Sequence, residues 1–298
     1  MIYHRSVLLN ESIEALAIRP GGIYVDATYG GGGHTGAILA KMTDGKVIAF
    51  DQDEEAIANK IEDPRLIMVS NNFRFLRNFL KLYKLPLVDG ILADLGISSH
   101  QIDQPERGFS TRFDGILDMR MDREKRLTAK DIIARYSEEK LMELFSTYGE
   151  VRNARKLAYR IALGRKEKSI ETTSDLKTII TSCAERGKEN KYFAQVFQAL
   201  RIEVNQEMEA LKDFLKQSAQ VLKPGGRLVV IAYHSLEDKL VKNFFRSGNF
   251  EDRIEKDFYG NVLSPLKVIT RKPITPEAKE IEENSRSRSA RMRVAEKI

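Results

Sequence analysis

The most constraining feature of the chain is a run of four glycines in the stretch Asp26-Ala-Thr-Tyr-Gly-Gly-Gly-Gly-His34. The run follows an apolar segment, residues 23–25, and leads into a helix-like segment, residues 35–41. Because glycine has no Cβ, such a backbone can approach a bound ligand very closely. Glycines between a strand and a helix therefore predict a nucleotide-type cofactor site at the carboxyl edge of a parallel sheet. Residues 31–36 also match the G-x-G-x-x-G dinucleotide pattern, but a lone match is a weak indication.

The composition sets wide limits on the class of protein. A chain of 298 residues, 42% of them apolar, can form one large globular domain or two ordinary ones. The longest uninterrupted apolar run, Leu228 to Tyr233, is too short to cross a bilayer, and the first residues lack a signal-peptide core. A single cysteine, Cys183, excludes internal disulfides and thiolate metal clusters and is typical of a reducing cytosol. The net charge of +6 favours a polyanionic partner without establishing one.

Short apolar segments alternate with helical ones in the first third of the chain. Four of them lack helical spacing and are typical of strands buried on both faces: residues 23–28, 47–51, 66–69 and 90–95. Helical patterns lie between them, at residues 35–42, 54–61 and 73–83. This alternation predicts an α/β fold with a parallel, doubly wound, Rossmann-like sheet.

The alternation stops at Gln104 and returns only after Asn205. Between them we find only helical patterns, including residues 137–147 and residues 174–186, the latter with Ser174 as its cap and Gly187 as its stop. Residues 207–222 then form an amphipathic helix, followed by a strand up to Tyr233. We therefore expect one α/β domain, residues 1–104 and 206–298, with an inserted all-helical domain, residues 105–205.

Two features bear on the choice between adenosylmethionine and a dinucleotide. A helix that ends in Leu222-Lys-Pro-Gly-Gly-Arg227 and leads directly into a buried strand recurs in adenosylmethionine-dependent methyltransferases. Asp51 ends the second strand, where a carboxylate can accept both ribose hydroxyls of an adenosine. This second feature does not separate the cofactors, because NAD enzymes place an acid similarly.

A stronger indication is Asp94-Leu-Gly-Ile97 after the fourth strand, where amino-group methyltransferases carry Asp/Asn-Pro-Pro-aromatic. An exocyclic base amine is a poor nucleophile, because its lone pair is delocalised into the ring. A carboxylate oxygen and a backbone carbonyl that accept both N–H bonds favour the pyramidal, attacking nitrogen, an effect of roughly a few kcal/mol. Ile97 replaces the aromatic that would stack on a flipped base, so another ring must do so or the base is held by other means.

Nine ordered motifs extend this interpretation over the chain from about His4 to Arg293: Gly22–His34, Phe50–Asp53, Asp94–Ser99, Arg107–Ser110, Leu117–Asp122, Thr147–Glu150, Phe197–Asn205, His234–Asp238 and Asn284–Ser289. Together they resemble the RsmH (formerly MraW) family of bacterial 16S ribosomal RNA cytosine-N4 methyltransferases. The resemblance implies a class I methyltransferase fold and methyl transfer to N4 of a cytidine in the decoding region of the small subunit. It also implies adenosylmethionine contacts at Gly32, Gly33, His34, Asp51, Phe73, Asp94 and Gln101. One departure is Tyr192-Phe-Ala-Gln195, where the family usually has a His-Pro-Ala-Thr-like run, which weakens the transfer of substrate contacts around residues 190–195.

The candidate catalytic residues are Asp94, Ser98, Asp118 and His234. Each also has an ordinary structural interpretation. Asp118 belongs to an acidic and basic stretch that is either a salt-bridged surface loop or part of the cleft. Residues 235–238 have the pattern of a helix N-cap at Ser235 with acids in the first turn, while His234 faces the substrate or only packs.

Two basic segments are candidates for RNA contact. Arg152, Arg155, Lys156 and Arg160 recur at helical spacing opposite an apolar stripe of Ala154, Leu157, Ala158 and Ile161. The tail from Arg286 to Arg293 contains four arginines and no acid. Arginines bind phosphates bidentately and supply salt-dependent affinity. The alternatives are a solvated helix face and a disordered tail.

We expect a cytoplasmic, adenosylmethionine-dependent enzyme that acts on ribosomal RNA, with no membrane partner. Transfer of a methyl group from a sulfonium is an in-line displacement, so positioning matters most and no metal is needed. The alternatives are an NAD-dependent dehydrogenase, disfavoured because no hydride-transfer constellation accompanies the loop, and a non-catalytic ribosome-assembly factor with a retained cofactor fold. The oligomeric state and the exact nucleotide do not follow from the sequence.

Overall fold

The computed structural model describes residues 6–260 and 262–298, and these form two compact units. An α/β unit contains the chain up to Gly96 together with Met208–Ile298, and a helical unit contains Ile97–Glu207. The helical unit thus begins eight residues before the expected insertion and ends two residues after it. The expected domain limits stay a prediction, because a compact unit is not by itself a domain that folds alone.

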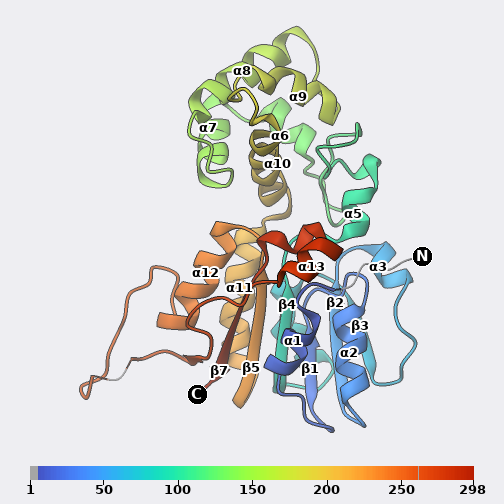
Figure 1. Cartoon of the computed structure of the whole chain (residues 1–298), viewed down its shortest axis with the longest axis vertical. Coiled ribbons are helices and arrows are strands. Elements are labelled where there is room, and N and C mark those ends of the chain that lie inside the picture. Colours follow the sequence, from blue (N-terminus) through green and yellow to red (C-terminus); the bar gives the residue numbers. More distant parts are fainter. Residues whose placement is uncertain (1–5, 261) are drawn as a thin grey trace. The chain divides into compact units, whose positions relative to one another are not determined.

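A seven-stranded sheet forms the centre of the α/β unit, in the order β3-β2-β1-β4-β5-β7-β6 (Figure 1). The strands are β1 (Ile23–Asp26), β2 (Lys46–Asp51), β3 (Leu66–Ser70), β4 (Val88–Asp94), β5 (Leu222–Ala232), β6 (Leu266–Val268) and β7 (Arg291–Lys297). Strands β1 to β5 are parallel, while β7 pairs antiparallel with both β5 and β6. This order confirms the predicted doubly wound sheet and adds an antiparallel edge that the sequence analysis did not predict.

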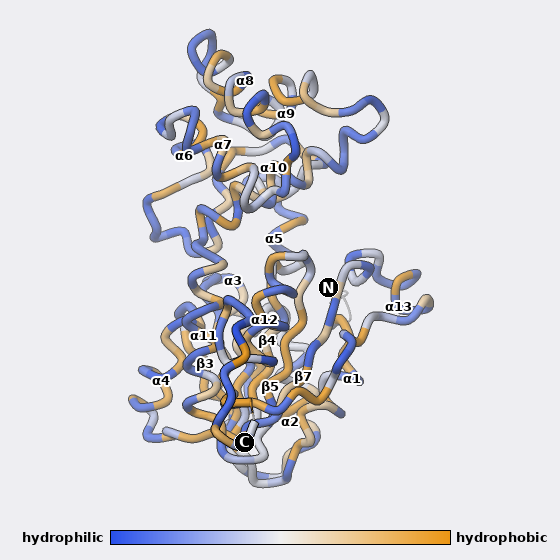
Figure 2. Tube along the Cα trace, turned by 90° about the vertical axis from the view of Figure 1, so that its left-hand side faces the viewer, coloured by the Kyte–Doolittle hydropathy of each residue, from blue (hydrophilic) through white to orange (hydrophobic). Residues whose placement is uncertain are grey.

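Helices cover both faces of this sheet, because side chains of successive strand residues point to opposite sides. Ile48, Phe50 and Val230 pack with α4, α11 and α12 on one face. Val47, Val229 and Met292 pack with the end of α1 and with α2 on the other face. Figure 2 shows the hydrophobic residues along β4 and β5. The helices are α1 (Leu9–Ala15), α2 (Gly33–Lys41), α3 (Glu54–Ala58), α4 (Leu76–Leu82), α11 (Glu207–Val221), α12 (Ser235–Ser247) and α13 (Ala278–Glu283), with short 3₁₀ turns η1 (Phe73–Phe75) and η3 (Ser285–Ser289).

The helical unit has its own apolar core, built around Leu157, Leu176 and Leu200. Its elements are α5 (Ser99–Asp103), η2 (Pro105–Arg107), α6 (Ala129–Arg135), α7 (Glu138–Thr147), α8 (Ala154–Glu167), α9 (Thr173–Thr181) and α10 (Glu189–Asn205). Two details of the α9 prediction were wrong. Thr172 caps the helix through a capping box with Asp175, so Ser174 lies inside the first turn, and the helix ends at Thr181, well before Gly187.

Among the described residues, no helix combines the length and the apolar character that a membrane span requires. The longest helix of the helical unit, α10, buries Val196, Leu200 and Ile202, while Lys191 is exposed and its other charged residues are half-buried. Its amphipathic pattern is therefore that of a helix that packs against other helices.

Candidate active site

Three acidic residues end neighbouring parallel strands at one edge of the sheet. Asp26 is the last residue of β1, Asp51 of β2 and Asp94 of β4. Strand β1 pairs with both β2 and β4, so these carboxyl ends lie together. Between β1 and β4 the strand order reverses its direction, which is where open α/β sheets bind their ligands. This edge is the candidate site, and two of its three acids, Asp51 and Asp94, are predicted site residues.

The glycine run makes the tight connection from β1 to α2. Gly30 and Gly32 have φ angles of +52° and +76°, which strongly favour glycine. A Cβ on Gly32 would lie 2.6 Å from the Tyr29 hydroxyl, and one on Gly33 would overlap the Ser6 hydroxyl. Helix α2 begins at Gly33, and its N-cap residue has no side chain to satisfy the first-turn amides. The loop therefore presents backbone N–H groups and the positive end of a helix dipole to a ligand.

Asp51 ties this loop to the end of β2. Its Oδ2 accepts a hydrogen bond of 2.8 Å from the Gly30 amide, and its Oδ1 accepts one of 2.9 Å from the Asp53 amide. Burial raises the pKa of Asp51 to about 6, against the opposing effect of these two amides. Asp53 instead caps α3, accepting from the Glu55 amide. The two acids, two residues apart, therefore have different contacts.

Asp94 is held from both sides at the end of β4. Its backbone amide donates to the Thr28 hydroxyl at 2.6 Å, and its Oδ1 accepts from the Tyr233 hydroxyl at 2.7 Å. The side chain is 21% exposed, so it reaches solvent while protein surrounds most of it. Burial raises the pKa of Asp94 to about 7, and the hydrogen bond from Tyr233 opposes this rise. Near neutral pH the carboxyl group is thus divided between its protonated and ionised forms.

Asp26 and His34 form the buried base of the site. Asp26 is fully buried and accepts from the Thr35 hydroxyl at 2.7 Å, and burial raises its pKa to about 7. His34 is 4% exposed, and its Nε2 lies 3.1 Å from the Val7 carbonyl. Burial lowers the pKa of His34 to about 4, so the ring is neutral at neutral pH. Its Nδ1 lies 3.9 Å from Asp94 Oδ2. Because the imidazole is neutral, the two side chains do not form an ion pair.

Phe73 begins η1, three residues after the end of β3. The ring is partly buried and packs edge-to-face on Phe214 of α11, with 5.2 Å between the ring centroids. The Asn72 side chain caps this turn by accepting from the Arg74 amide. The observed contacts are those of a core residue, and the cofactor contact of Phe73 stays a prediction.

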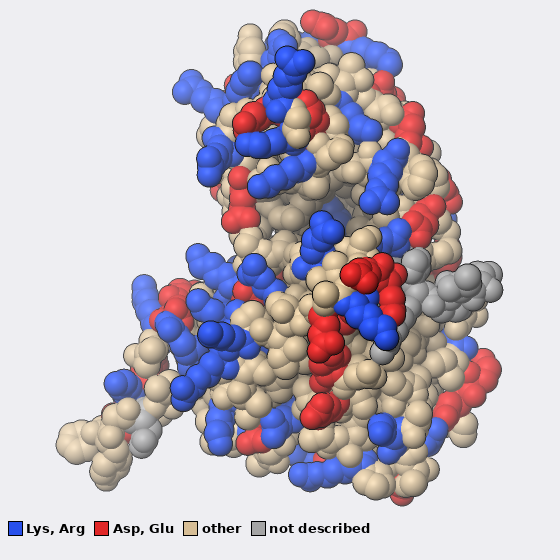
Figure 3. Space-filling view, in the orientation of Figure 1, with Lys and Arg blue, Asp and Glu red and all other residues tan. Residues whose placement is uncertain are grey.

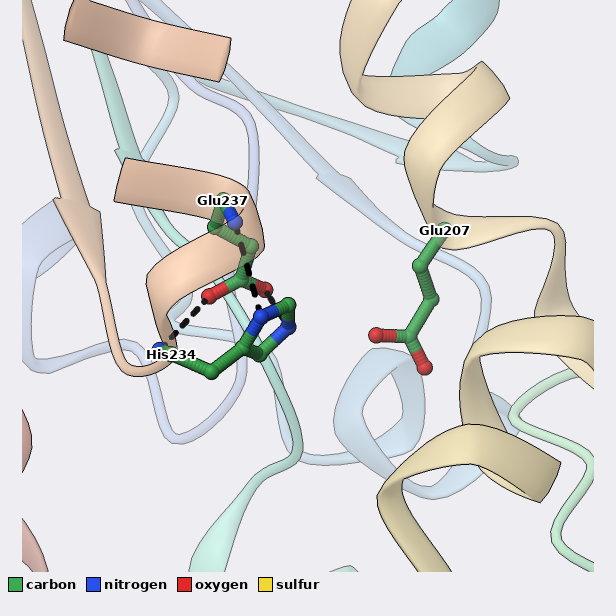
Figure 4. A group of neighbouring side chains, drawn as sticks. All are labelled: Glu207, His234 and Glu237. Atoms are coloured by element: carbon green, nitrogen blue, oxygen red, sulfur yellow. Dashed lines mark hydrogen bonds and ion pairs between the residues drawn. The ribbon is translucent and has the colours of Figure 1, made fainter. Parts of the chain in front are cut away.

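His234 is the N-cap of α12, so the prediction of a cap at Ser235 was wrong. Its Nδ1 lies 3.4 Å from the Glu237 amide, and the Glu237 carboxylate accepts from the His234 amide in return (Figure 4). His234 Nε2 lies 3.1 Å from Glu237 Oε1, without hydrogen-bond geometry. The ring therefore has a demonstrable structural role, and its catalytic role stays a prediction.

Three predicted site residues lie in the helical unit. Ser98 caps α5 in a capping box, in which its hydroxyl accepts from the Gln101 amide and the Gln101 side chain accepts from the Ser98 amide. Asp118 binds Arg120 through both carboxylate oxygens, at 2.7 and 2.8 Å, and this ion pair lowers its pKa. Their observed contacts are structural. Roles for Ser98 and Asp118 in catalysis, and for Gln101 in cofactor binding, stay predictions.

The two basic segments differ in structure. In α8 the predicted apolar stripe is buried, while Arg155, Lys156 and Arg160 are exposed, and Arg152 lies just before the helix. Figure 3 shows Lys and Arg side chains gathered on the helical unit around α7 and α8. The tail, in contrast, is ordered in η3 and β7, and its Arg293 is 7% exposed. Arg293 binds Asp238 at 2.6 Å, so this arginine is not available to RNA. The prediction of an RNA contact by this residue was wrong.

The sequence analysis missed Tyr233 and Glu237. Tyr233 follows β5 directly and reaches Asp94, and Glu237 accepts from the Tyr233 amide at 2.9 Å while being 2% exposed. A signal existed for Tyr233, because it is the first polar side chain after a buried strand and so lies at the same carboxyl edge as Asp94. No local pattern distinguishes Glu237 from an ordinary first-turn acid.

Comparison with known proteins gives consistent matches along the whole chain. Residues 1–298 match the model of the MraW methylase family. "Ribosomal RNA small subunit methyltransferase H" of Cytophaga hutchinsonii is 55% identical over 298 residues, covering 99% of this chain and 100% of that protein. The protein of the same name from Christiangramia forsetii is 52% identical over 299 residues, covering 100% and 99%. Among solved structures, an rRNA methylase from Streptococcus thermophilus has a TM-score of 0.44 and 11% identity over 100% of this chain and 99% of its own, too distant a likeness to bear on function.

Proposed function

The chain belongs to the MraW methylase family and uses S-adenosyl-L-methionine, and we propose that it methylates small-subunit ribosomal RNA at N4 of a cytidine. The RNA substrate is the one named for the relatives, and the N4 position in the decoding region of 16S RNA comes from the nine-motif resemblance. A cytoplasmic location follows from this substrate. Membership in a methylase family sets aside the NAD-dependent dehydrogenase.

The observation that carries this proposal is Asp94 at the carboxyl end of β4, beside the glycine loop. An enzyme that methylates a base amine needs an acceptor that orients the N–H bonds, and Asp94 offers a carboxyl group that is largely shielded from water. The amine nitrogen becomes acidic only once it has begun to bond to the methyl carbon. We therefore assign to Asp94 the orientation of the amine through hydrogen-bond acceptance, with proton removal following the transfer.

The residues at the sheet edge fit the cofactor. Gly32 and Gly33 leave no room for a Cβ beside Tyr29 and Ser6, so the loop keeps a bare backbone, and α2 begins there without a side-chain cap on its first amides. Asp51, fixed by Gly30 and Asp53, has carboxylate lone pairs suited to two ribose hydroxyls. When bound, the cofactor supplies an electrophilic methyl group on a sulfonium. We propose Gly32, Gly33, His34, Asp51, Phe73, Asp94 and Gln101 as the residues that hold it.

His34 contributes to this site through its backbone and its bulk. The imidazole is turned toward Val7 and is neutral, so it adds no charge near a sulfonium. It also shields Asp94, which keeps water away from the carboxylate. We propose that the backbone of His34, in the first turn of α2, makes the cofactor contact, and that its side chain fixes the segment around Val7.

For the RNA we propose a contact surface on α8 formed by Arg155, Lys156, Tyr159 and Arg160. All four side chains are exposed, Tyr159 by 53%. Arginine and lysine bind phosphates, and an exposed aromatic ring among them offers a stacking surface for an unpaired base. Lys156 and Arg160 donate hydrogen bonds to Ser182 at the end of α9, which limits the freedom that their side chains lose on binding.

Mass spectrometry of RNA after incubation with the protein and isotopically labelled adenosylmethionine tests the proposal. We expect label at N4 of a single cytidine, and the test is made with bare 16S transcript and with assembled small subunits. The matched control is Asp94→Ala, which should give far less labelled cytidine. The protein could instead bind adenosylmethionine in calorimetry and leave both RNA preparations unlabelled. That result would contradict the proposal and favour the non-catalytic assembly factor.

A further inference from the structure

Tyr233 follows β5 directly, and its side chain reaches Asp94 at the end of the neighbouring strand β4. In the pairing of β4 with β5, Asp94 lies opposite Ile231, the last paired residue. Tyr233 follows two residues later. Its hydroxyl donates a hydrogen bond of 2.7 Å to Asp94 Oδ1. The other carboxylate oxygen, Oδ2, faces His34 Nδ1 at 3.9 Å, which is beyond hydrogen-bond distance.

We propose that Tyr233 is a positioning residue for methyl transfer, whose hydroxyl engages Oδ1 of Asp94 and leaves Oδ2 to accept from the substrate amine. This inference rests on the proposed function of Asp94. Tyr233 itself need not touch the substrate. It acts by restricting the rotation of the carboxylate and by stabilising its ionised form.

The tyrosine is fixed at both ends. Its backbone amide donates to Glu237 Oε2 at 2.9 Å, and Glu237 is itself locked into the capping box at the start of α12. The ring lies beside the turn after Asp94, since a Cβ at Gly96 would be 3.6 Å from Tyr233 Cδ2. The ring also packs against the apolar cluster beneath α1 and α2. The direction of the hydroxyl is therefore set by the fold and not by the carboxylate alone.

The surroundings of Asp94 show why this donor matters. Burial acts most strongly against its ionised form, and three acids on other elements add to this: Asp26 on β1, Glu237 on α12 and Glu280 on α13. His34 on α2 also faces the carboxylate, but its pKa of about 4 leaves it neutral. The Tyr233 hydroxyl opposes these effects, because a hydrogen bond donated to the charged form favours it. Burial and Asp94 hold the pKa of Tyr233 well above its usual value, so it stays a donor at working pH.

The test is the pH dependence of single-turnover methylation by Tyr233→Phe. Removing a hydrogen bond to a charged group should raise the pKa of Asp94 by about one to two units. The ionised carboxylate is the active form, so the midpoint of the acid limb should move to higher pH by the same amount. The rate should fall roughly tenfold at pH 7 and recover toward the parent value near pH 9. The affinity for RNA should stay unchanged, which a general loss of structure would not produce.

Tyr136→Phe is the matched control. It removes a hydroxyl that donates to the Glu203 carboxylate, also at 2.7 Å, within the helical unit. This control should leave the acid limb of the pH profile where it is. An equal shift in both variants, or no shift in Tyr233→Phe, would overturn the inference.

A second measurement does not depend on activity. Carbon-13 NMR of the aspartate carboxyl groups in the cofactor-free protein follows the titration of Asp94 directly. A higher pKa in Tyr233→Phe supports the inference even if the parent protein proves unable to methylate RNA, an outcome that would contradict only the proposed function. An unchanged Asp94 pKa contradicts the inference, whatever the substrate.

Discussion

The two units treat their acidic residues in opposite ways. In the helical unit, Asp118 binds Arg120 and Asp175 binds Lys168, and these pairs lower the pKa of both acids. At the carboxyl edge of the sheet, Asp26, Asp51 and Asp94 accept from hydroxyl groups and backbone amides, and burial raises the pKa of all three. An aspartate of the helical unit thus stabilises the fold through an ion pair. An aspartate at the sheet edge is buried in a place that disfavours its ionised form.

The contrast is local to that edge and not a property of the whole α/β unit. Asp89 in β4 binds Lys223, and Asp63 binds Arg65, and in both the pKa is lowered. At the ends of β1, β2 and β4 the acids combine burial, a raised pKa and neutral donors. Clusters of raised pKa values are typical of functional sites, and here they coincide with the glycine loop. The difference therefore supports our proposal that the chemistry takes place at this edge of the α/β unit.

The largest effect is expected for Asp94. Asp94→Ala should lower the single-turnover rate about 100- to 1,000-fold, as deletion of one preorganised group usually does. Asp94→Asn keeps one acceptor oxygen and should retain measurable turnover. Asp118→Asn, in the helical unit, should cost much less. Equal and complete loss in both Asp94 variants would indicate essential proton abstraction, and near-full activity of Asp94→Ala would remove this residue from the mechanism.

Asp51 should dominate cofactor affinity. Asp51→Ala removes the charged acceptor for the ribose hydroxyls and should weaken adenosylmethionine binding by about 2–4 kcal/mol in calorimetry. The matched control is Asp53→Ala, which deletes the cap of α3 and should cost stability more than affinity. If Asp53→Ala weakened binding more than Asp51→Ala, our assignment of this turn would be wrong.

Asp26 should make the cofactor-free protein less stable as pH rises. Its pKa is raised to about 7, so the folded state holds a proton that the unfolded state releases near pH 4. The stabilisation is complete at low pH and is lost as pH rises toward 7. In the parent protein this effect should lower the free energy of unfolding by about 2–3 kcal/mol between pH 5 and 7.5. Asp26→Asn should abolish that decrease, which urea unfolding at the two pH values measures.

Two other groups define the control for that experiment. His34 acts in the opposite direction, because its lowered pKa of about 4 favours the folded state as pH rises toward 6.5. Its effect is opposed by the raised pKa values of Asp26, Asp51 and Asp94. Asp63→Asn is the matched variant, since the pKa of Asp63 is about 2 and lies below the pH range. It should leave the difference between pH 5 and 7.5 unchanged. An unchanged difference in Asp26→Asn would mean that Asp26 is ionised throughout.

The smallest expected effect concerns the basic face of α8. Replacing Arg152, Arg155 and Arg160 together with Gln should weaken RNA binding and leave cofactor affinity unchanged. Each phosphate that is no longer bound should reduce the salt slope of binding by about 0.7–0.9. Arg135→Gln is a control in the same unit, at an arginine that is 78% exposed and pairs with Asp131 on α6. Equal salt slopes for parent and triple variant would favour a merely solvated face.

The sequence predicted the parts of the fold that depend on local pattern. The apolar runs of β1 to β5 and the amphipathic stripe of α11 are visible in short windows, and the structure confirms them. Strand β7 was missed because Arg291 and Arg293 make its sequence resemble a basic tail. Arg293 is buried only because Asp238, 55 residues away, neutralises it, and such a distant partner leaves no local pattern.

The same limit applies to the candidate site. Asp51 and Asp94 could be predicted because each ends an apolar strand, and parallel strands bring their ends together. Tyr233 and Glu237 act through contacts with residues that β5 and α12 place beside them, which depend on the register of the sheet. The caps of α9 and α12 were displaced by one or two residues, because neighbouring side chains compete for the same role.

The most direct test of the account is a carbon-13 NMR titration that follows Asp94 and Asp118 in one sample of the cofactor-free protein. Burial should place the pKa of Asp94 at about 7, while the Arg120 ion pair should keep the pKa of Asp118 below its usual value. Finding Asp94 well above Asp118 would support a shielded acceptor at the sheet edge and a paired, structural acid in the helical unit. Ordinary values for both residues, or the reverse order, would contradict the account.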